Sequence, residues 1–153
     1  MKSILEDMAL VDAAVGKDAT YEDAARVLAA SEAPTVAVLD DDRKVVGLFG
    51  IEQALRGCMP SYLLEMRHTA FAQDDLAVLA DRAREVLDDP ILEHAVDPVT
   101  VDLRTSAFHV AEVFLHEGMA GIAVVDGARY AGILGRAAFA RAMLRRALAD
   151  AGS

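Results

Sequence analysis

The chain has 153 residues, which is enough for one ordinary domain or for two small units that share a core, but not for two large domains. Apolar residues make up 54% of the sequence and aromatic residues only 5%, so Val, Leu, Ile and Ala must form most of the core. The formal net charge of −10 argues against nucleic acid or an anionic membrane as a partner, because both need a basic surface.

Cysteine content and the first residues indicate the compartment. Cys58 is the only cysteine, so the chain has no internal disulfide and no cysteine-based zinc site. The N-terminus carries acids where a secretion signal has basic residues, and no apolar stretch reaches the roughly 18–20 residues of a membrane span. We therefore expect a soluble, cytoplasmic protein.

Two stretches of the chain share one pattern of residue types. Residues 13–50 align with residues 99–135. The offset is 86 residues where Asp126 aligns with position 40, and 85 residues where Gly132 aligns with position 47. A repeat of this length indicates two similar structural units.

Each copy is predicted to begin with a short strand, near residues 13–15 and 99–101. A helix follows in both copies, with apolar residues at helical spacing. In the first copy, Thr20 with Asp23 predicts a capping box, whereas the second helix has only the hydroxyl of Ser106 at its start.

Two apolar runs follow each helix and predict a strand pair joined by a turn rich in Asp, Gly or Arg. The runs are TVAVLD and VVGLFG in the first copy, and GIAVVD and YAGILG in the second. Closing helices are predicted over residues 51–56 and 136–148. The predicted fold class is therefore α/β, with two β-α-β-β-α units packed as a pseudo-symmetric pair.

The residues between the two copies are predicted to form a helical connector. Apolar spacing over residues 74–87 predicts an amphipathic helix, capped by Asp74 or Asp75. The expected organisation is a first unit, a connector, a second unit and a tail, at residues 1–57, 58–90, 91–148 and 149–153.

No group of residues in the sequence predicts catalysis or metal binding. His109, Glu112 and His116 share one face of a predicted helix, and we interpret them as a solvated polar stripe. The sequence has neither a nucleophile elbow nor a His-Glu-x-x-His motif. We therefore expect no enzyme activity, no catalytic residue and no metal.

A duplicated β-α-β-β-α unit whose strand pair reads apolar-Val-Val-Asp, a turn and Gly-apolar-apolar resembles the tandem CBS (cystathionine β-synthase) domain family. The resemblance covers residues 4–144, and residues 60–71 look like the connector of small standalone bacterial CBS pairs. It implies a regulatory module that forms a homodimer through its helices. It also implies two clefts between the units that bind an adenine nucleotide such as AMP, ADP or ATP, with no required cofactor.

The family's binding signature runs Gly, two apolar residues, Thr or Ser, two residues of any kind, then Asp. In the family the hydroxyl contacts phosphate, and the carboxylate accepts hydrogen bonds from the ribose. This chain has Gly50 and Gln53 at those two positions in the first copy, and Gly135 and Ala138 in the second. Neither an amide nor a methyl group can make the charge-assisted bonds of a carboxylate.

A ligand is still compatible with these junctions. Glycine lets the backbone approach a phosphate, and Arg136 could supply a countercharge. The alternative interpretation is that Gly50 and Gly135 only allow a tight turn where the two halves pack. By matching positions in the family, one cleft would be lined by Val15, Gly16, Lys17, Thr35, Val36, Gly47, Gly50 and Gln53. The other would be lined by Thr100, Val101, Asp102, Gly121, Ile122, Gly132, Gly135 and Arg136.

Two functional hypotheses follow from the resemblance. The first is a non-catalytic regulatory module that binds an adenosine-type nucleotide or related metabolite and relays this to a protein partner that the sequence does not identify. The second is a CBS pair that has lost nucleotide binding and serves as a constitutive dimerisation scaffold. The altered signature favours the second hypothesis.

Overall fold

The computed structural model describes residues 5, 8, 10–59 and 76–151. The elements of the first unit are β1 (Ala14–Gly16), α2 (Tyr21–Ala30), β2 (Thr35–Leu39), β3 (Val45–Gly50) and α3 (Ile51–Gly57). Those of the second unit are β4 (Thr100–Asp102), α6 (Ala107–Glu117), β5 (Gly121–Asp126), β6 (Arg129–Gly135) and α7 (Arg136–Ala151). Between them lie α5 (Leu76–Arg84) and the 3-10 turn η1 (Ile91–Glu93). The predicted duplicated β-α-β-β-α order is confirmed.

The helices differ in length from the prediction. α7 continues through Ala151, three residues beyond its predicted end at position 148. The connector helix ends before the predicted position 87, because α5 ends at Arg84 and a series of turns follows. The expected cap at Asp74 or Asp75, and the connector segment 60–71, lie outside the described residues.

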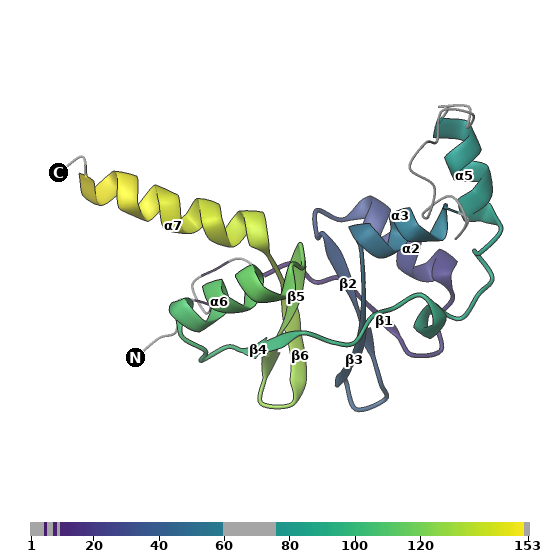
Figure 1. The fold of residues 1–153 in the computed structure, drawn as a ribbon. Helices are drawn as coiled ribbons and strands as arrows, with labels where there is room; N and C mark the ends of the chain where they lie inside the picture. The colour runs from purple at the N-terminus through teal and green to yellow at the C-terminus, as the bar shows by residue number, and fades with distance from the viewer. Residues whose placement is uncertain (1–4, 6–7, 9, 60–75, 152–153) are drawn as a thin grey trace.

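Each unit forms a three-stranded mixed sheet. β1 pairs with β2 in parallel and β3 pairs with β2 antiparallel, and β4, β5 and β6 repeat this order. The parallel pairs need a crossover, which α2 and α6 provide. Figure 1 shows the two sheets side by side, with α2 and α3 beside one and α6 and α7 beside the other.

Local sequence fixes the starts of the crossover helices. The Thr20 hydroxyl accepts a hydrogen bond from the Asp23 N–H (3.3 Å), and the Asp23 carboxylate accepts one from the Thr20 N–H (3.0 Å), which confirms the capping box. In α6 the Ser106 hydroxyl accepts from the His109 N–H (3.2 Å). Both caps agree with the sequence prediction.

The two units exchange the residues that precede their first strands, which we call the leading segments (residues 10–13 and 91–99). Val11 in the first leading segment pairs with Ile133 of β6 through two backbone hydrogen bonds of 3.0 and 2.8 Å. Val96 in the second pairs with Leu48 of β3 through bonds of 3.0 and 2.9 Å. Figure 1 shows the second leading segment crossing from η1 towards β4.

The exchange completes the hydrophobic cores. Ile91 is fully buried among Tyr21, Val38 and Phe49 of the first unit. Leu5, 86 residues before Ile91, is fully buried in the cluster of the second unit. A third cluster joins residues of β2 and β3 to residues of β5 and β6 between the sheets. Each core therefore depends on a side chain from outside its own unit.

Tyr130 fixes the first leading segment from the side of β6. Its hydroxyl accepts a hydrogen bond from the Ala13 N–H (2.8 Å) and lies 3.1 Å from the Asp12 carboxylate, to which it donates. Burial raises the pKa of Tyr130 to about 12, so the phenol keeps its proton at neutral pH. Its N–H donates to the carbonyl of Arg43 (2.9 Å), a residue with a left-handed backbone at φ 63°.

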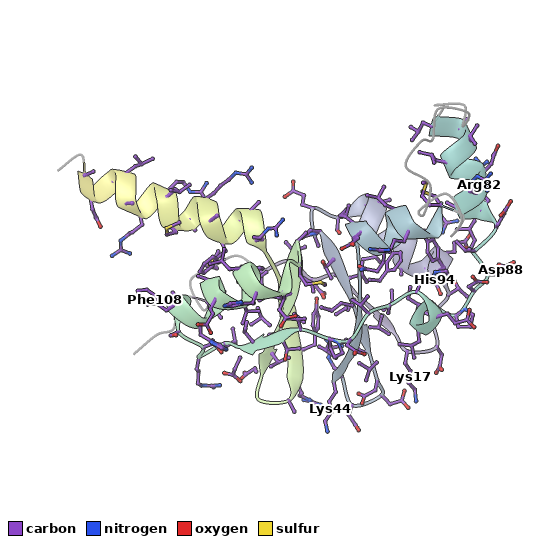
Figure 2. The ribbon with its side chains drawn as sticks, viewed as in Figure 1. Lys17, Lys44, Arg82, Asp88, His94 and Phe108 are labelled. Atoms are coloured by element: carbon purple, nitrogen blue, oxygen red, sulfur yellow. The ribbon has the colours of Figure 1, made fainter. Side chains whose placement is uncertain are left out.

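The surface helices leave apolar side chains uncovered. Phe108 and Leu115 on α6 are 91% and 84% exposed, and Leu148 on α7 is 72% exposed. α7 projects away from the sheets, and Figure 2 shows Phe108 on the outer surface of α6. Of the helices that the structure describes, none has the length and apolar content needed to cross a membrane.

Candidate ligand cleft between the two units

Two adjoining cavities lie between the units, and they share Glu52, Gln53 and Met119. The larger, of about 820 Å³, lies between the first turns of α3, the second leading segment and the end of α6. The smaller, of about 270 Å³, lies where α3 and α7 begin, beside Thr35, Gly50 and Arg136. The volume of the larger cavity is in the range of small-molecule sites.

The cleft draws on both copies of the repeat. Of the predicted site residues, Thr35, Gly50 and Gln53 come from the first copy, and Thr100 and Arg136 come from the second. The family pattern had assigned these five residues to two separate clefts. They meet because the exchanged leading segment brings the start of β4 next to α3 of the first unit.

Gln53, at the position of the family's carboxylate, is 8% exposed and its carbonyl oxygen is already engaged. This oxygen accepts a hydrogen bond from the Gly50 N–H (2.8 Å), which is one half of a capping box for α3. The NH₂ group of Gln53 can donate to a ligand in the cleft, and its carbonyl oxygen keeps one lone pair. Because this neutral amide stands where the family has a carboxylate, a bond from a ribose hydroxyl would lack the charge assistance of an ionised acceptor.

Gly50, at the position of the family's hydroxyl residue, faces Thr35. A Cβ atom at Gly50 would lie 3.0 Å from the Thr35 hydroxyl and 3.2 Å from the Gln53 carbonyl oxygen. The buried Thr35 hydroxyl donates to the carbonyl of Gly121 (3.3 Å). A side chain at position 50 would thus compete with Thr35 for space, and the hydroxyl beside the smaller cavity comes from β2.

Four other glycines of the predicted site pack elements together. A Cβ atom at Gly121 would lie 2.8 Å from Pro34 Cγ, and one at Gly132 would lie 2.7 Å from Leu10 Cβ. At Gly47 the nearest atom is Ala95 Cβ, at 3.1 Å. Gly135 lies beside Pro34 at 3.6 Å. Close packing therefore accounts for Gly47, Gly121 and Gly132, whereas Gly135, one of the two glycines of the tight-turn interpretation, has only an ordinary contact.

The remaining predicted site residues lie away from this cleft. Val36, Val101 and Ile122 are buried in the hydrophobic clusters. Val15 and Gly16 line a separate cavity of about 310 Å³ with Asp12, Asp40 and Arg43. Lys17 forms an ion pair with Asp41 (3.7 Å) in the neighbouring hairpin.

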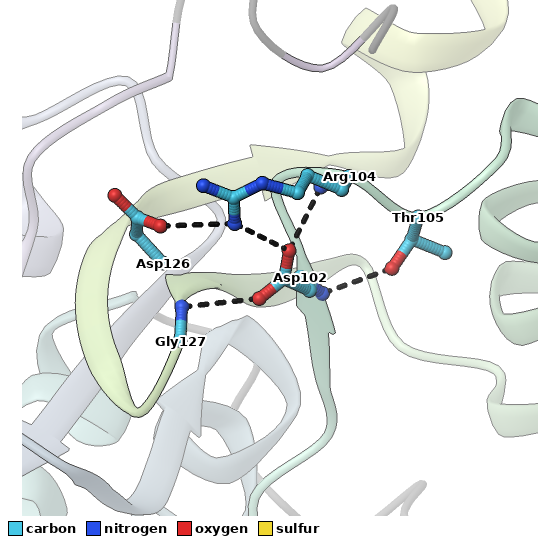
Figure 3. A network of polar contacts seen from close by, with 5 residues as sticks. All are labelled: Asp102, Arg104, Thr105, Asp126 and Gly127. Carbon is cyan, nitrogen blue, oxygen red and sulfur yellow. Dashed lines mark hydrogen bonds and ion pairs between the residues drawn. The ribbon is translucent and has the colours of Figure 1, made fainter.

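Asp102 fastens two turns of the second unit together (Figure 3). Its carboxylate accepts hydrogen bonds from the N–H groups of Arg104 (2.9 Å) and Gly127 (3.1 Å). The Arg104 guanidinium lies between Asp102 (3.3 Å) and Asp126 (3.1 Å). These contacts hold the pKa of Asp102 below its ordinary value of 3.8, and the hydrogen bond from the Arg104 N–H has the largest effect.

Replacing Asp102 with asparagine is expected to lower the free energy of unfolding at neutral pH, because the folded state stabilises the ionised carboxylate more than the unfolded state does. A lowered pKa contributes stability above pH 3.8, which is lost as the pH falls through the folded-state pKa. The urea midpoints of wild type and Asp102→Asn should therefore differ at pH 7, and the difference should shrink as the pH falls below 3.8. The exposed Asp18→Asn is the control, and a difference that does not change with pH would contradict the assignment.

Among the described residues, one cluster of side chains has the atoms that commonly bind metal ions, and no sequence motif predicted it. Oxygen or nitrogen atoms of Asp89, Glu93 and His94 lie within 4.8 Å of one another. The His94 Nε2 is 2.8 Å from the Asp89 carboxylate, and its ring packs edge-on against Tyr21 at 4.9 Å. These contacts hold η1 against α2. The three residues lie in and beside the 3-10 turn η1, so no regular helix or known metal-binding motif pointed to them.

Comparisons with known proteins agree with this fold. Residues 89–145 match the family model of the CBS domain. A CBS domain-containing protein of unknown function from Kribbella flavida is 21% identical, with a TM-score of 0.69 over 94% of this chain and 99% of that one. A CBS domain protein from Pyrobaculum aerophilum complexed with AMP is 18% identical, with a TM-score of 0.67 over 95% and 97%. No curated protein matches the sequence.

The structure of CBSX2 in complex with AMP gives a similar result, at 18% identity and a TM-score of 0.65 over 95% of this chain and 98% of that one. The fold is thus that of a tandem CBS pair over nearly the whole chain. Residues 89–145 match the CBS-domain family model, and the rest of the chain shares the fold of CBS-domain proteins. The resemblance drawn from the repeat is confirmed.

Proposed function

We propose that this CBS pair is a regulatory module that binds an adenosine-type ligand in the cleft between its two units. The observation that carries the proposal is that Thr35 and Gln53 of the first unit and Arg136 of the second line the same cavity, which adjoins the larger one. Structural relatives described as complexes with AMP support it. We assign it no catalytic step.

Binding in this cleft would act on the contact between the units. The larger cavity is bounded by α3 of the first unit and by Val96, Asp97 and Thr100 of the second leading segment. A ligand that fits one arrangement of these walls better than another shifts the population towards it. The shift would reach a protein partner through the outer helices.

The exposed apolar side chains of α6 and α7 support a partner on that surface. We propose that this partner is a second copy of the chain. We further propose that the protein acts in the cytoplasm of a bacterial cell. We also retain the division into a first unit (1–57), a connector (58–90), a second unit (91–148) and a tail (149–153). In this division the leading segments are the parts that cross between units.

The alternative function is a constitutive interaction scaffold without a nucleotide. A specific observation favours it: the neutral Gln53 stands where the family has a carboxylate, and one lone pair of its carbonyl oxygen is bonded to the Gly50 N–H. In this case the cleft would be a structural gap, and the outer helices alone would carry the function.

Adenine compounds are expected to raise the unfolding temperature by several degrees if the proposal is correct. A ligand at a hundred times its Kd stabilises the folded state by about 2.7 kcal/mol. The panel is AMP, ADP, ATP, S-adenosylmethionine and NAD, with GTP as the specificity control. Arg136→Ala should abolish the shift produced by a phosphorylated ligand, whereas Arg146→Ala, on the same helix and 84% exposed, should leave it. No shift at millimolar concentration would leave the scaffold as the better proposal.

A further inference from the structure

We infer that the cleft selects adenosine-type ligands with one phosphate or none over di- and triphosphates, an inference that rests on the proposed function. The charges on its walls carry this inference. The larger cavity is lined by three acids, Glu52, Asp97 and Glu117, and by a single basic residue, Arg56. The smaller cavity adds one cation, Arg136.

Arg56 is not available to a phosphate without breaking an existing pair. Its Nη2 atom lies 2.9 Å from Glu52 Oε1, four residues earlier on α3. This pair contributes no net charge to the cavity. Asp97 and Glu117 remain, and no ion pair joins either one to a basic side chain within the described part of the chain. The larger cavity therefore carries an excess of negative charge.

Arg136 can balance one phosphate group. It lines the smaller cavity beside Gly50, so a single phosphate there would have the guanidinium as its charged partner, whereas the Thr35 hydroxyl already donates its proton to the Gly121 carbonyl. The cavity measures about 270 Å³, and the described residues that line it include no second cation. The second and third phosphates of ATP would find no basic partner in the two cavities other than Arg56, which is paired with Glu52.

Additional phosphates would also meet repulsion. A polyphosphate that extends from Arg136 into the larger cavity approaches the acids Asp97 and Glu117, which repel it. The net charge of −10 on the whole protein repels it as well. A neutral adenosine avoids this penalty and also forgoes the pairing with Arg136. AMP has one charged group for the one cation, so we expect it to bind best.

The test is calorimetric titration of the full chain with adenosine, AMP, ADP and ATP at fixed ionic strength and without Mg²⁺, which would mask phosphate charge. ATP should bind about tenfold or more weakly than AMP, since each uncompensated charge near a like charge costs affinity. The double variant Asp97→Asn, Glu117→Gln should narrow that ratio to about threefold or less. Glu112→Gln, an exposed acid on the same helix as Glu117, is the matched control and should keep the ratio.

The outcomes separate this inference from the proposed function. If ATP binds as tightly as AMP, or if the double variant leaves the ratio unchanged, the charge selectivity is wrong while nucleotide sensing stands. If none of the four compounds binds, both the sensing function and the selectivity are overturned. Unfolding temperatures of the variants show whether the exposed substitutions have left the fold intact.

Discussion

Replacing Ile91 with alanine is expected to lower the free energy of unfolding by about 2–5 kcal/mol, although the residue lies outside the first unit whose core it fills. Its side chain is fully buried, and it packs with Tyr21, Val38 and Phe49. Truncation would leave a cavity between α2 and the first sheet, and this packing cannot easily close it. Urea unfolding followed by circular dichroism measures the effect.

The neighbouring Leu92 supplies the control for this prediction. Its side chain is 46% exposed, so Leu92→Ala should cost clearly less than Ile91→Ala. Equal losses for the two variants would mean that the second leading segment does not pack on the first unit as described. A loss confined to Ile91 would establish that the exchanged segment belongs to the core.

Gly121→Ala is expected to destabilise the chain by about 1–3 kcal/mol through overpacking. An added Cβ atom would lie 2.8 Å from Pro34 Cγ and 2.9 Å from the Thr35 hydroxyl, closer than such atoms approach in folded proteins. Pro34 is a ring on the backbone and cannot rotate away. The substitution also disturbs the hydrogen bond from Thr35 to the Gly121 carbonyl, at the point where the two units meet.

Gly16→Ala is the matched control, because it is also a glycine in a strand but an added Cβ atom would have no neighbour within 4 Å. It should be neutral or slightly stabilising, since alanine restricts the unfolded chain. The two variants are compared by urea midpoint at one pH. If Gly121→Ala is as stable as Gly16→Ala, the close contact between the units at β5 is wrong.

The sequence predicted the repeated elements well because their signals are local. Alternating turns, apolar runs and hydroxyl caps lie within a few residues of each other, and the caps at Thr20 and Ser106 formed as expected. The exchange of leading segments could not be predicted in this way. It depends on pairings such as that of Val11 with Ile133, which are far apart in the chain and leave no local pattern.

The candidate site was predicted less completely than the fold. Matching positions named Thr35, Gly50, Gln53, Thr100 and Arg136, all of which line the cleft, but also glycines that serve packing. The acids Asp97 and Glu117 were missed because they belong to no signature. The capping role of Gln53 did have a signal, since Gln at the third helical position is typical of a capping box.

The exchanged leading segments mean that folding free energy cannot be divided between the two halves of the chain. A fragment holding only the second unit would lack Leu5, and one holding only the first would lack Ile91, so each would expose an unfilled core. The two fragments are complementary, and together they contain every pairing described for the intact chain. Heat or denaturant should accordingly melt both sheets in one cooperative transition, as expected of a single folding unit.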